Sequence, residues 1–368
     1  MAGNQDTGFP LTADCDKINE VQVQPVARKL AWGAAYFYVA CMVAYVFIHF
    51  GGLNFYPRAS FDLMLSGKAD KPYVGRMLVP QTINWINEQS PDGLKQTVAN
   101  VIGSDYFLPD YYGVPKDPIQ FPYAVTILLI FAALMYTGIA FGGRAAYIAV
   151  YGNAGPIANL VGLLYLLAVP LWFRYTGYIY DPMTILLATW ILYAATKSNI
   201  WLCCVLFILA CCNKETAPLL LPVIGYGIWR KRGIPIAVGS CVALLIAAVL
   251  IQLHRLDEFS ANGGLWTEPH WLDHQVSLVT QYTMSFLYAF AVMAAFLWLA
   301  LKNFKQKPMI LRVGLCCTLI PLFLASIPFG FVDEIRALYD SYPFVTLLAI
   351  PTAFAFFAGV NLPTSQPA

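Results

Sequence analysis

The sequence predicts an all-α protein whose helices form a polytopic transmembrane bundle. Hydrophobic residues make up 59% of its 368 residues, charged residues make up 11%, and the mean hydropathy is +0.62. These values lie far from those of soluble domains. The apolar runs are spread along the whole chain, so a single anchor would not account for them. The net charge of +2 gives no indication of a nucleic-acid partner.

About ten apolar segments approach the length of roughly 20 residues that a helix needs to cross the hydrocarbon core. They lie at 30–50, 122–142, 155–172, 182–196, 199–212, 216–229, 234–252, 278–301, 310–331 and 343–360. The third to sixth are short or interrupted, so about eight to eleven spans fit the pattern.

Charge predicts the orientation, because basic residues in short loops mark the cytoplasmic side of a membrane. Arg28 and Lys29 precede the first span, which predicts a cytoplasmic N-terminus. If about ten spans alternate, the even-numbered connections contain basic charges alone. Every acidic residue beyond the N-terminal tail then falls in an odd-numbered connection. We therefore expect both termini in the cytoplasm and the protein in a bacterial inner membrane.

The long first external connection, 51–121, should contain helices of its own, because a loop of this length without regular structure is uncommon. Its stretch "VGRMLVPQTINWI" places apolar residues on one helical face, with Trp85 and Tyr73 suited to the headgroup layer. We expect interfacial or re-entrant helices there. The expected organisation is a cytoplasmic tail (1–27), a single transmembrane domain (28–361) and a C-terminal tail (362–368).

Seven charged residues stand at the predicted outer ends of the spans. They are Asp62, Arg76, Asp181, Lys214, Glu215, Glu334 and Arg336. Each has an ordinary structural explanation: a carboxylate such as Asp181 complements a helix N-terminus, and neighbours such as Lys214 and Glu215 can form interfacial ion pairs. Their gathering on one membrane face instead favours a shared pocket, since charges that face a bundle interior are costly and usually functional.

Such a pocket suits transfer of a group from a lipid phosphate. A phosphate leaving group needs Arg or Lys to neutralise its developing charge, and Arg can clamp phosphate oxygens in a bidentate way. A sugar hydroxyl that acts as nucleophile needs a carboxylate within hydrogen-bond reach as general base. Tyrosine and tryptophan supply flat faces for a sugar and for an isoprenoid chain.

The order of these residues resembles that of the multi-spanning GT-C glycosyltransferases, which use polyprenyl-phosphate sugars on the non-cytoplasmic face of the membrane. The pattern consists of Asp62 in the first external loop, "PYVGRMLVP" with Arg76, "YDP" with Asp181, "NKET" with Lys214 and Glu215, and "EIR" from Glu334 to Arg336. The segments are short, and it is their order, spacing and shared side that carry the likeness.

The resemblance implies a role for each residue of the pattern. Asp62 would be the catalytic base, Arg76, Lys214 and Arg336 would contact the lipid phosphate, and Asp181, Glu215 and Glu334 would shape the site. A divalent metal, Mg or Mn, would use Asp62 and Asp181 as ligands, although the first loop lacks the adjacent pair of acids found in many metal-dependent members. Only a short tail follows the last span, so we expect a small or lipid-linked acceptor.

Three other functions fit parts of the sequence. The protein could be a non-catalytic membrane subunit of a larger complex built on a GT-C-like fold, with membrane partners. A transporter would place its coupling residues near mid-membrane, often in two matching halves, whereas these charges cluster at one surface. A membrane acyltransferase would need an intramembrane histidine, and none of the four histidines lies in the middle of a predicted span.

Overall fold

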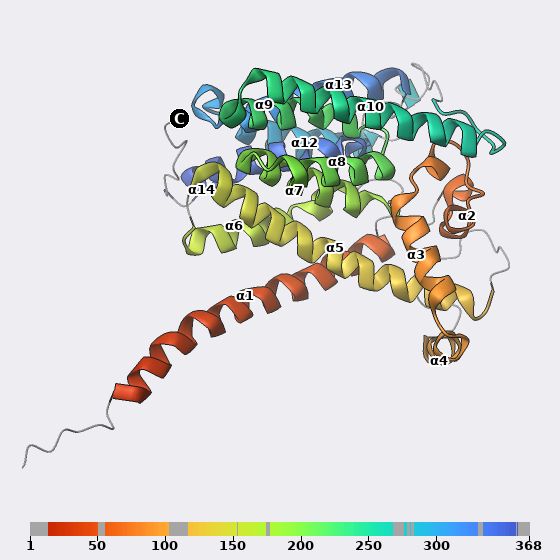
Figure 1. The fold of residues 1–368 in the computed structure, drawn as a ribbon, viewed down its shortest axis with the longest axis horizontal. Coiled ribbons are helices and arrows are strands. Elements are labelled where there is room, and N and C mark those ends of the chain that lie inside the picture. Colours follow the sequence, from red (N-terminus) through yellow and green to blue (C-terminus); the bar gives the residue numbers. More distant parts are fainter. Residues whose placement is uncertain are drawn as a thin grey trace, which may run out of the picture.

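The computed structural model describes residues 14–50, 56–102, 117–152, 154–173, 177–267, 276–277, 280, 283–329, 334–357 and 359. Within these ranges the chain forms helices and turns and no strand, which confirms the all-α prediction. Most of the helices run lengthwise in one bundle, and α1 extends beyond it (Figure 1).

Every predicted apolar segment coincides with a helix or with a helix and an adjoining 3₁₀ turn. The helices are α1 (Asp14–Phe50), α5 (Gln120–Tyr151), α6 (Pro156–Leu167), α7 (Asp181–Lys197), α8 (Ile200–Asn213), α9 (Leu221–Arg232), α10 (Ile234–Glu258), α12 (Thr283–Leu301), α13 (Met309–Phe329) and α14 (Tyr342–Phe357). Among the described residues, five segments are long and apolar enough to cross a membrane: Val26–His49, Gln120–Tyr151, Ile234–Glu258, Met309–Phe329 and Ile335–Phe357. Pro156–Trp172, Ile200–Asn213 and Phe286–Leu301 are apolar but shorter.

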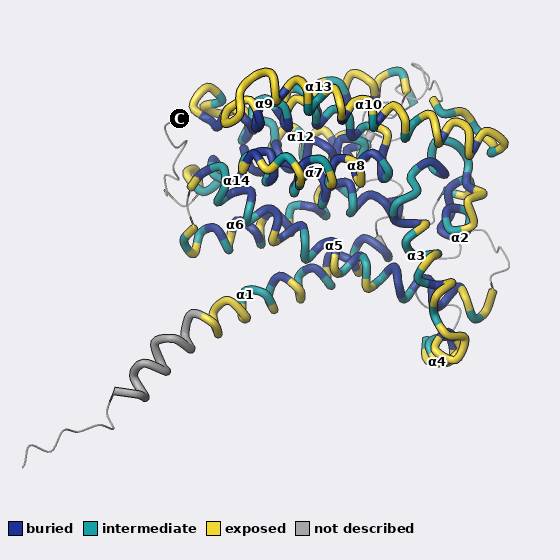
Figure 2. Tube along the Cα trace, viewed as in Figure 1, coloured by how far each residue is buried: buried dark blue, intermediate teal, exposed yellow. Residues whose placement is uncertain are grey.

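The outer surface of the bundle has the composition expected of a membrane protein. Helix α10 shows this most clearly, because only 11% of its apolar window is buried, against 67% for Ile335–Phe357. Much of its trace is exposed in Figure 2, and its large apolar side chains, such as Val242 and Leu250, are at least half exposed. Soluble proteins rarely expose an apolar surface of this extent, so α10 is an outer helix with a surface suited to lipid, and α14 is an inner one.

The first connection contains helices, as predicted for its described part. They are α2 (Phe61–Leu65), α3 (Leu78–Gln89) and α4 (Asp92–Ile102), with 3₁₀ turns at Pro57–Ala59 and Tyr73–Gly75; residues 51–55 and 103–116 lie outside the described ranges. All three helices lie at one end of the bundle (Figure 1). Trp85 is 64% exposed on α3, whereas Tyr73 turns inward and packs on Tyr178 with ring centroids 4.9 Å apart.

The opposite end of the bundle gathers the basic connections. There the Lys231 ammonium lies 3.5 Å from the carbonyl oxygen of Lys197. Lys307 is buried, and its ammonium donates to carbonyls of α12 and α14, including that of Leu348 at 2.7 Å, and to the hydroxyl of Thr352 at 2.7 Å. Lys307 therefore ties the end of α12 to the interior of α14 rather than standing in solvent as a loop charge.

Helix α1 begins earlier than its apolar run. It starts at Asp14, inside the segment 1–27 that was expected to be a tail, while residues 1–13 lie outside the described ranges. Extending an existing helix adds one hydrogen bond for each residue fixed, whereas nucleating a new one is costly. The apolar part of α1 thus supports a helical extension that hydrophobicity alone does not predict.

Helix α7 lies at the centre of the packing and positions the charged end of the bundle. It contacts α5, α8, α9 and α14. Its contact with α9 is close: a Cβ at Gly227 would stand 2.2 Å from the Ala195 carbonyl oxygen, so only glycine fits. The N-terminus of α7 at Asp181 and the C-terminus of α8 at Asn213 consequently lie side by side.

Candidate functional site

A pocket of about 290 Å³ lies at the end of the bundle where α2, α3 and α4 gather. Its lining comes from the first connection, the start of α7, the α8–α9 turn, the end of α13 and the segment before α14. The charged residues in that lining are Arg76, Asp181, Lys214, Glu215, Glu334 and Arg336, and its aromatic residues are Tyr73, Trp266 and Phe329. The structure thus brings together six of the seven predicted site residues.

Two stacked tyrosines before α7 separate the two arginines of the pocket. The Tyr178 and Tyr180 rings are nearly parallel, with centroids 5.3 Å apart and an angle of 11° between them. The Arg336 guanidinium lies 4.2 Å from the Tyr178 centroid, and that of Arg76 lies 4.5 Å from the Tyr180 centroid. Cation–π attraction holds each arginine over its ring, so the "YIYD" segment fixes both positive charges in place.

Arg76 binds Glu215 in a bidentate pair that joins the first connection to the α8–α9 turn. Its Nε donates to Oε2 of Glu215 at 3.1 Å, its Nη2 donates to Oε1, and its Nη1 donates to the Tyr180 hydroxyl. Burial raises the pKa of the Glu215 carboxyl, but the charge and hydrogen bonds of Arg76 outweigh burial and lower it to about 2. Glu215 is therefore an anion throughout the physiological range.

Lys214, next in sequence to Glu215, faces a different partner. Its ammonium donates to Oδ2 of Asp340 at 3.2 Å, and the Thr216 hydroxyl donates to the same oxygen at 2.7 Å. The side chains of Lys214 and Asp340 are only 9% and 3% exposed, so this is a buried pair. An ion pair between the neighbours Lys214 and Glu215, which the sequence allowed as a structural explanation, is not among those of the described residues, because Glu215 pairs with Arg76 instead.

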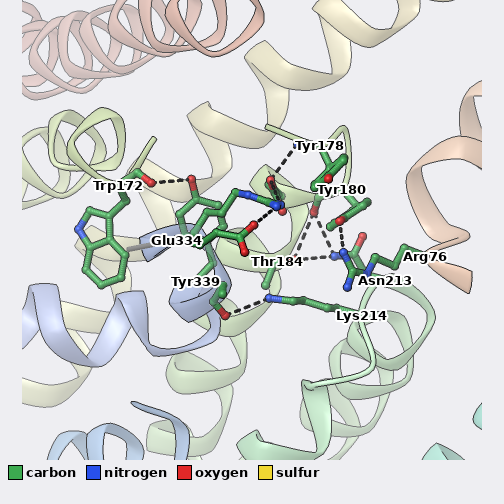
Figure 3. A network of polar contacts seen from close by, with 12 residues as sticks. Arg76, Trp172, Tyr178, Tyr180, Thr184, Asn213, Lys214, Glu334 and Tyr339 are labelled. Atoms are coloured by element: carbon green, nitrogen blue, oxygen red, sulfur yellow. Dashed lines mark hydrogen bonds and ion pairs between the residues drawn. The ribbon is translucent and has the colours of Figure 1, made fainter. Parts of the chain in front are cut away.

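Asn213 anchors this turn to α7. Its side-chain Nδ2 donates to the carbonyl oxygen of Tyr180 at 3.1 Å and to Oγ1 of Thr184 at 2.9 Å. Both acceptors lie at the start of α7, so the end of α8 cannot slide along that helix without breaking buried hydrogen bonds. Figure 3 shows Asn213 and Lys214 between Arg76 and Glu334 in this network.

Arg336 completes the set of cations. It pairs with Glu334, and its Nη1 lies 3.7 Å from Oδ2 of Asp181. Asp181 also accepts a hydrogen bond of 2.9 Å from the backbone N–H of Tyr178. The Nε of Arg336 is buried and has no acceptor among the described residues. One donor of this guanidinium is thus not used by the protein residues that the structure describes.

Asp62, the predicted catalytic base, is not among the residues that line the pocket. It lies half-buried in the first turn of α2. The next acid in this segment, Asp70, forms an ion pair with Arg58. No group of three His, Cys, Asp or Glu residues that could hold a metal occurs in the described part of the chain, and Asp181, the other predicted metal ligand, is engaged by Arg336.

Three residues of this end were missed by the sequence reasoning: Asp340, Trp266 and Arg255. Asp340 lies in the stretch "VDEIRALYDSYPF", four residues after Arg336, and its position at the predicted outer end of the last span was an available signal. Trp266 lies in the connection after α10, which is polar, aromatic-rich and long enough to shape a pocket, but no motif distinguishes it from the other aromatic residues there. Arg255 lies near the outer end of an apolar span, where a solvated charge is ordinary. Only its burial, which the sequence does not reveal, indicates a special role.

No family model, no curated protein and no solved structure matches this chain. The class of protein therefore follows from fold and site alone: the described residues form an all-helical bundle, with helices long and apolar enough to cross a membrane and a pocket of paired charges at one end.

The buried pair of Lys214 and Asp340 predicts a strong dependence of stability on both partners. Lys214→Met leaves the Asp340 carboxylate buried without its cation, which we expect to cost about 3–5 kcal/mol of unfolding free energy. Removing both charges in Lys214→Met/Asp340→Leu should recover most of that loss. Denaturant unfolding in mixed micelles measures both values. Equal destabilisation in the single and double variants would contradict the buried pair.

The Arg76–Glu215 pair predicts a stability change at acid pH. The Glu215 carboxyl has an ordinary pKa of 4.5 and about 2 in the folded chain, so its contribution to stability is complete above pH 4.5 and declines as the pH falls toward 2. The melting temperature in detergent should therefore fall more between pH 5 and pH 3 for the wild type than for Glu215→Gln.

Glu88→Gln serves as the matched control, because Glu88 is exposed on α3 and lines none of the pocket. Its melting temperature should change with pH as that of the wild type does. An equally steep acid loss in Glu215→Gln would show that the Arg76–Glu215 pair does not stabilise the fold.

Proposed function

We propose that the protein is a membrane glycosyltransferase that moves a sugar from a polyprenyl-phosphate donor to a small or lipid-linked acceptor. The observation that supports this most strongly is the pocket itself. Three basic side chains, three carboxylates and three aromatic rings line one cavity at the end of a membrane bundle. These side chains come from segments that are as far apart in the sequence as Arg76 and Arg336. Folding therefore brings distant charged residues of the sequence pattern into one pocket.

In this proposal the pocket lies at the outer face of a bacterial inner membrane. The bundle has about ten spans, with the five long helices crossing fully and the shorter ones, such as α8, meeting water-filled space at their ends. Both termini lie in the cytoplasm. The acids are then confined to the outer side, where a polyprenyl-phosphate sugar would present its head group.

The reaction would require each kind of side chain in the pocket. The acceptor hydroxyl attacks the anomeric carbon of the sugar, the bond from that carbon to the phosphate oxygen breaks, and the lipid phosphate leaves with the bonding electrons. Arg76, Lys214 and Arg336 would stabilise the charge that develops on the phosphate. A carboxylate takes the proton of the hydroxyl. Tyr73 and Trp266 offer ring faces for the sugar.

Because the basic groups are already paired with carboxylates, a phosphate must share or displace those partners. The unused Nε of Arg336 is one donor open to sharing. Glu215, with 36% of its side chain exposed, is the most exposed of the three carboxylates that line the pocket. Binding of the donor would therefore exchange one set of charge-assisted hydrogen bonds for another, with a small net cost.

The same pairing favours a second candidate, a non-catalytic membrane subunit. Each of the three basic residues, Arg76, Lys214 and Arg336, has a carboxylate partner within the chain. The ion pairs can therefore stabilise the fold without any bound substrate. In that case the pocket charges hold helix ends together inside a larger complex. The decisive difference is turnover, which only the enzyme shows.

The test is transfer by the purified full-length protein from a panel of radiolabelled polyprenyl-phosphate sugars. If Asp62 is the base, Asp62→Asn should reduce the rate by about 100-fold or more. Asp70→Asn, in the same segment but paired with Arg58, is the matched control and should keep a rate close to that of the wild type.

Glu334→Gln and Glu215→Gln complete the comparison, because these carboxylates line the pocket. If wild type and Asp62→Asn have equal rates, and Glu334→Gln or Glu215→Gln has a much lower rate, the catalytic base is the residue changed in the slower variant and not Asp62. If no donor gives turnover, the proposal of a glycosyltransferase is contradicted and the proposal of a non-catalytic membrane subunit is supported.

A further inference from the structure

Arg255 is a buried cation on a helix that otherwise faces lipid. Only 2% of its surface is exposed, whereas apolar side chains that precede it on α10, such as Leu250 and Leu253, are more than half exposed. The acidic side chains that follow it, Asp257 and Glu258, are exposed as well. Its Nη2 donates to the carbonyl oxygen of Cys211, the one hydrogen bond it makes within the described residues, and its Nε is buried there without an acceptor. A guanidinium has five donors, so most of this one's capacity is unused.

Arg255 lines a cavity of about 230 Å³ between the end of α8, the α8–α9 turn and α10. Gln252 adds a second polar side chain, and Ala248, Val249 and Pro218 supply apolar wall. Glu215 also lines this cavity, but both of its carboxylate oxygens are bound by Arg76. Among the described residues Arg255 therefore forms no ion pair with a carboxylate, and an unpaired buried cation is costly.

A second, mostly apolar groove of about 610 Å³ lies open on the surface between α9 and α10. Side chains such as Tyr226, Trp229, Val238 and Val242 line it, and Leu245 lines both this groove and the cavity of Arg255. The two spaces therefore adjoin. The helical rise from Arg255 to Leu245, at the near end of the groove, amounts to roughly 15 Å, which is about half the thickness of a hydrocarbon core and so the depth of one leaflet.

We propose that these two cavities bind one anionic membrane lipid, with its phosphate at Arg255 and a hydrocarbon chain in the groove between α9 and α10. The phosphate supplies the acceptor and the negative charge that Arg255 lacks, and Gln252 donates to a further oxygen. The groove, lined by apolar side chains, matches the chain of the lipid. This site is distinct from the pocket of the proposed sugar transfer and does not depend on that activity, although Lys214 and Glu215 line both.

Native mass spectrometry of the full-length protein tests the proposal, with phosphatidylglycerol and phosphatidylcholine as probes. The wild type should retain phosphatidylglycerol in clear preference to phosphatidylcholine. Arg255→Gln should weaken retention of phosphatidylglycerol roughly tenfold or more, since a hydrogen bond to a charged group contributes about that much. Arg255→Lys keeps the charge and should lose less than Arg255→Gln.

A matched pair of variants on the exposed face of α10 distinguishes the effect of filling the groove from a general loss of folding. Val242→Trp fills the groove and should also weaken retention. Ile246→Trp should leave it unchanged, because Ile246 is comparably exposed on α10 but lines neither cavity. Unchanged retention in Arg255→Gln or in Val242→Trp would overturn the proposal. So would displacement of the lipid by inorganic phosphate alone, because that result would define a site for the free anion.

Discussion

The arrangement of this protein depends on one constraint: a charge buried at the end of the bundle must have either a partner of opposite charge or a full set of hydrogen bonds. Lys214 follows the last residue of an apolar helix and is nearly inaccessible to water. Its carboxylate partner, Asp340, comes from a segment more than a hundred residues later. An unpaired charge at either position would cost several kcal/mol, so the end of α8 and the start of α14 are held together.

The other pairs extend the same constraint across the bundle end. The Arg76–Glu215 pair joins the first connection to the α8–α9 turn, and Arg336 joins the segment before α14 to the start of α7. The stacked tyrosines between these arginines keep the two positive charges apart. The result is a pocket whose walls are fixed by electrostatics at one end, while apolar packing around α7 fixes the remainder of the bundle.

Much of this could be predicted from sequence. Hydropathy predicts every long helix of the bundle. The confinement of the acidic residues to one set of connections predicts that six charged residues gather at one end: Arg76, Asp181, Lys214, Glu215, Glu334 and Arg336. Pairing could not be predicted, because Lys214 and Glu215 are neighbours in sequence whose side chains diverge. The sequence also could not predict that Asp62 lies outside the lining of the pocket, because the position of the short helix α2 depends on tertiary packing. The helical extension of α1 back to Asp14 carries no hydrophobic signal.

The most direct test of the central claim, that the charged pocket and the basic connections lie on opposite sides of a membrane, is labelling of single cysteines in a cysteine-free background. Ser260, beyond the end of α10, and Lys305, between α12 and α13, are both exposed. In intact cells a membrane-impermeant maleimide should label Ser260→Cys and should reach Lys305→Cys only after permeabilisation. Labelling of both from one side, or the reverse pattern, would contradict the account.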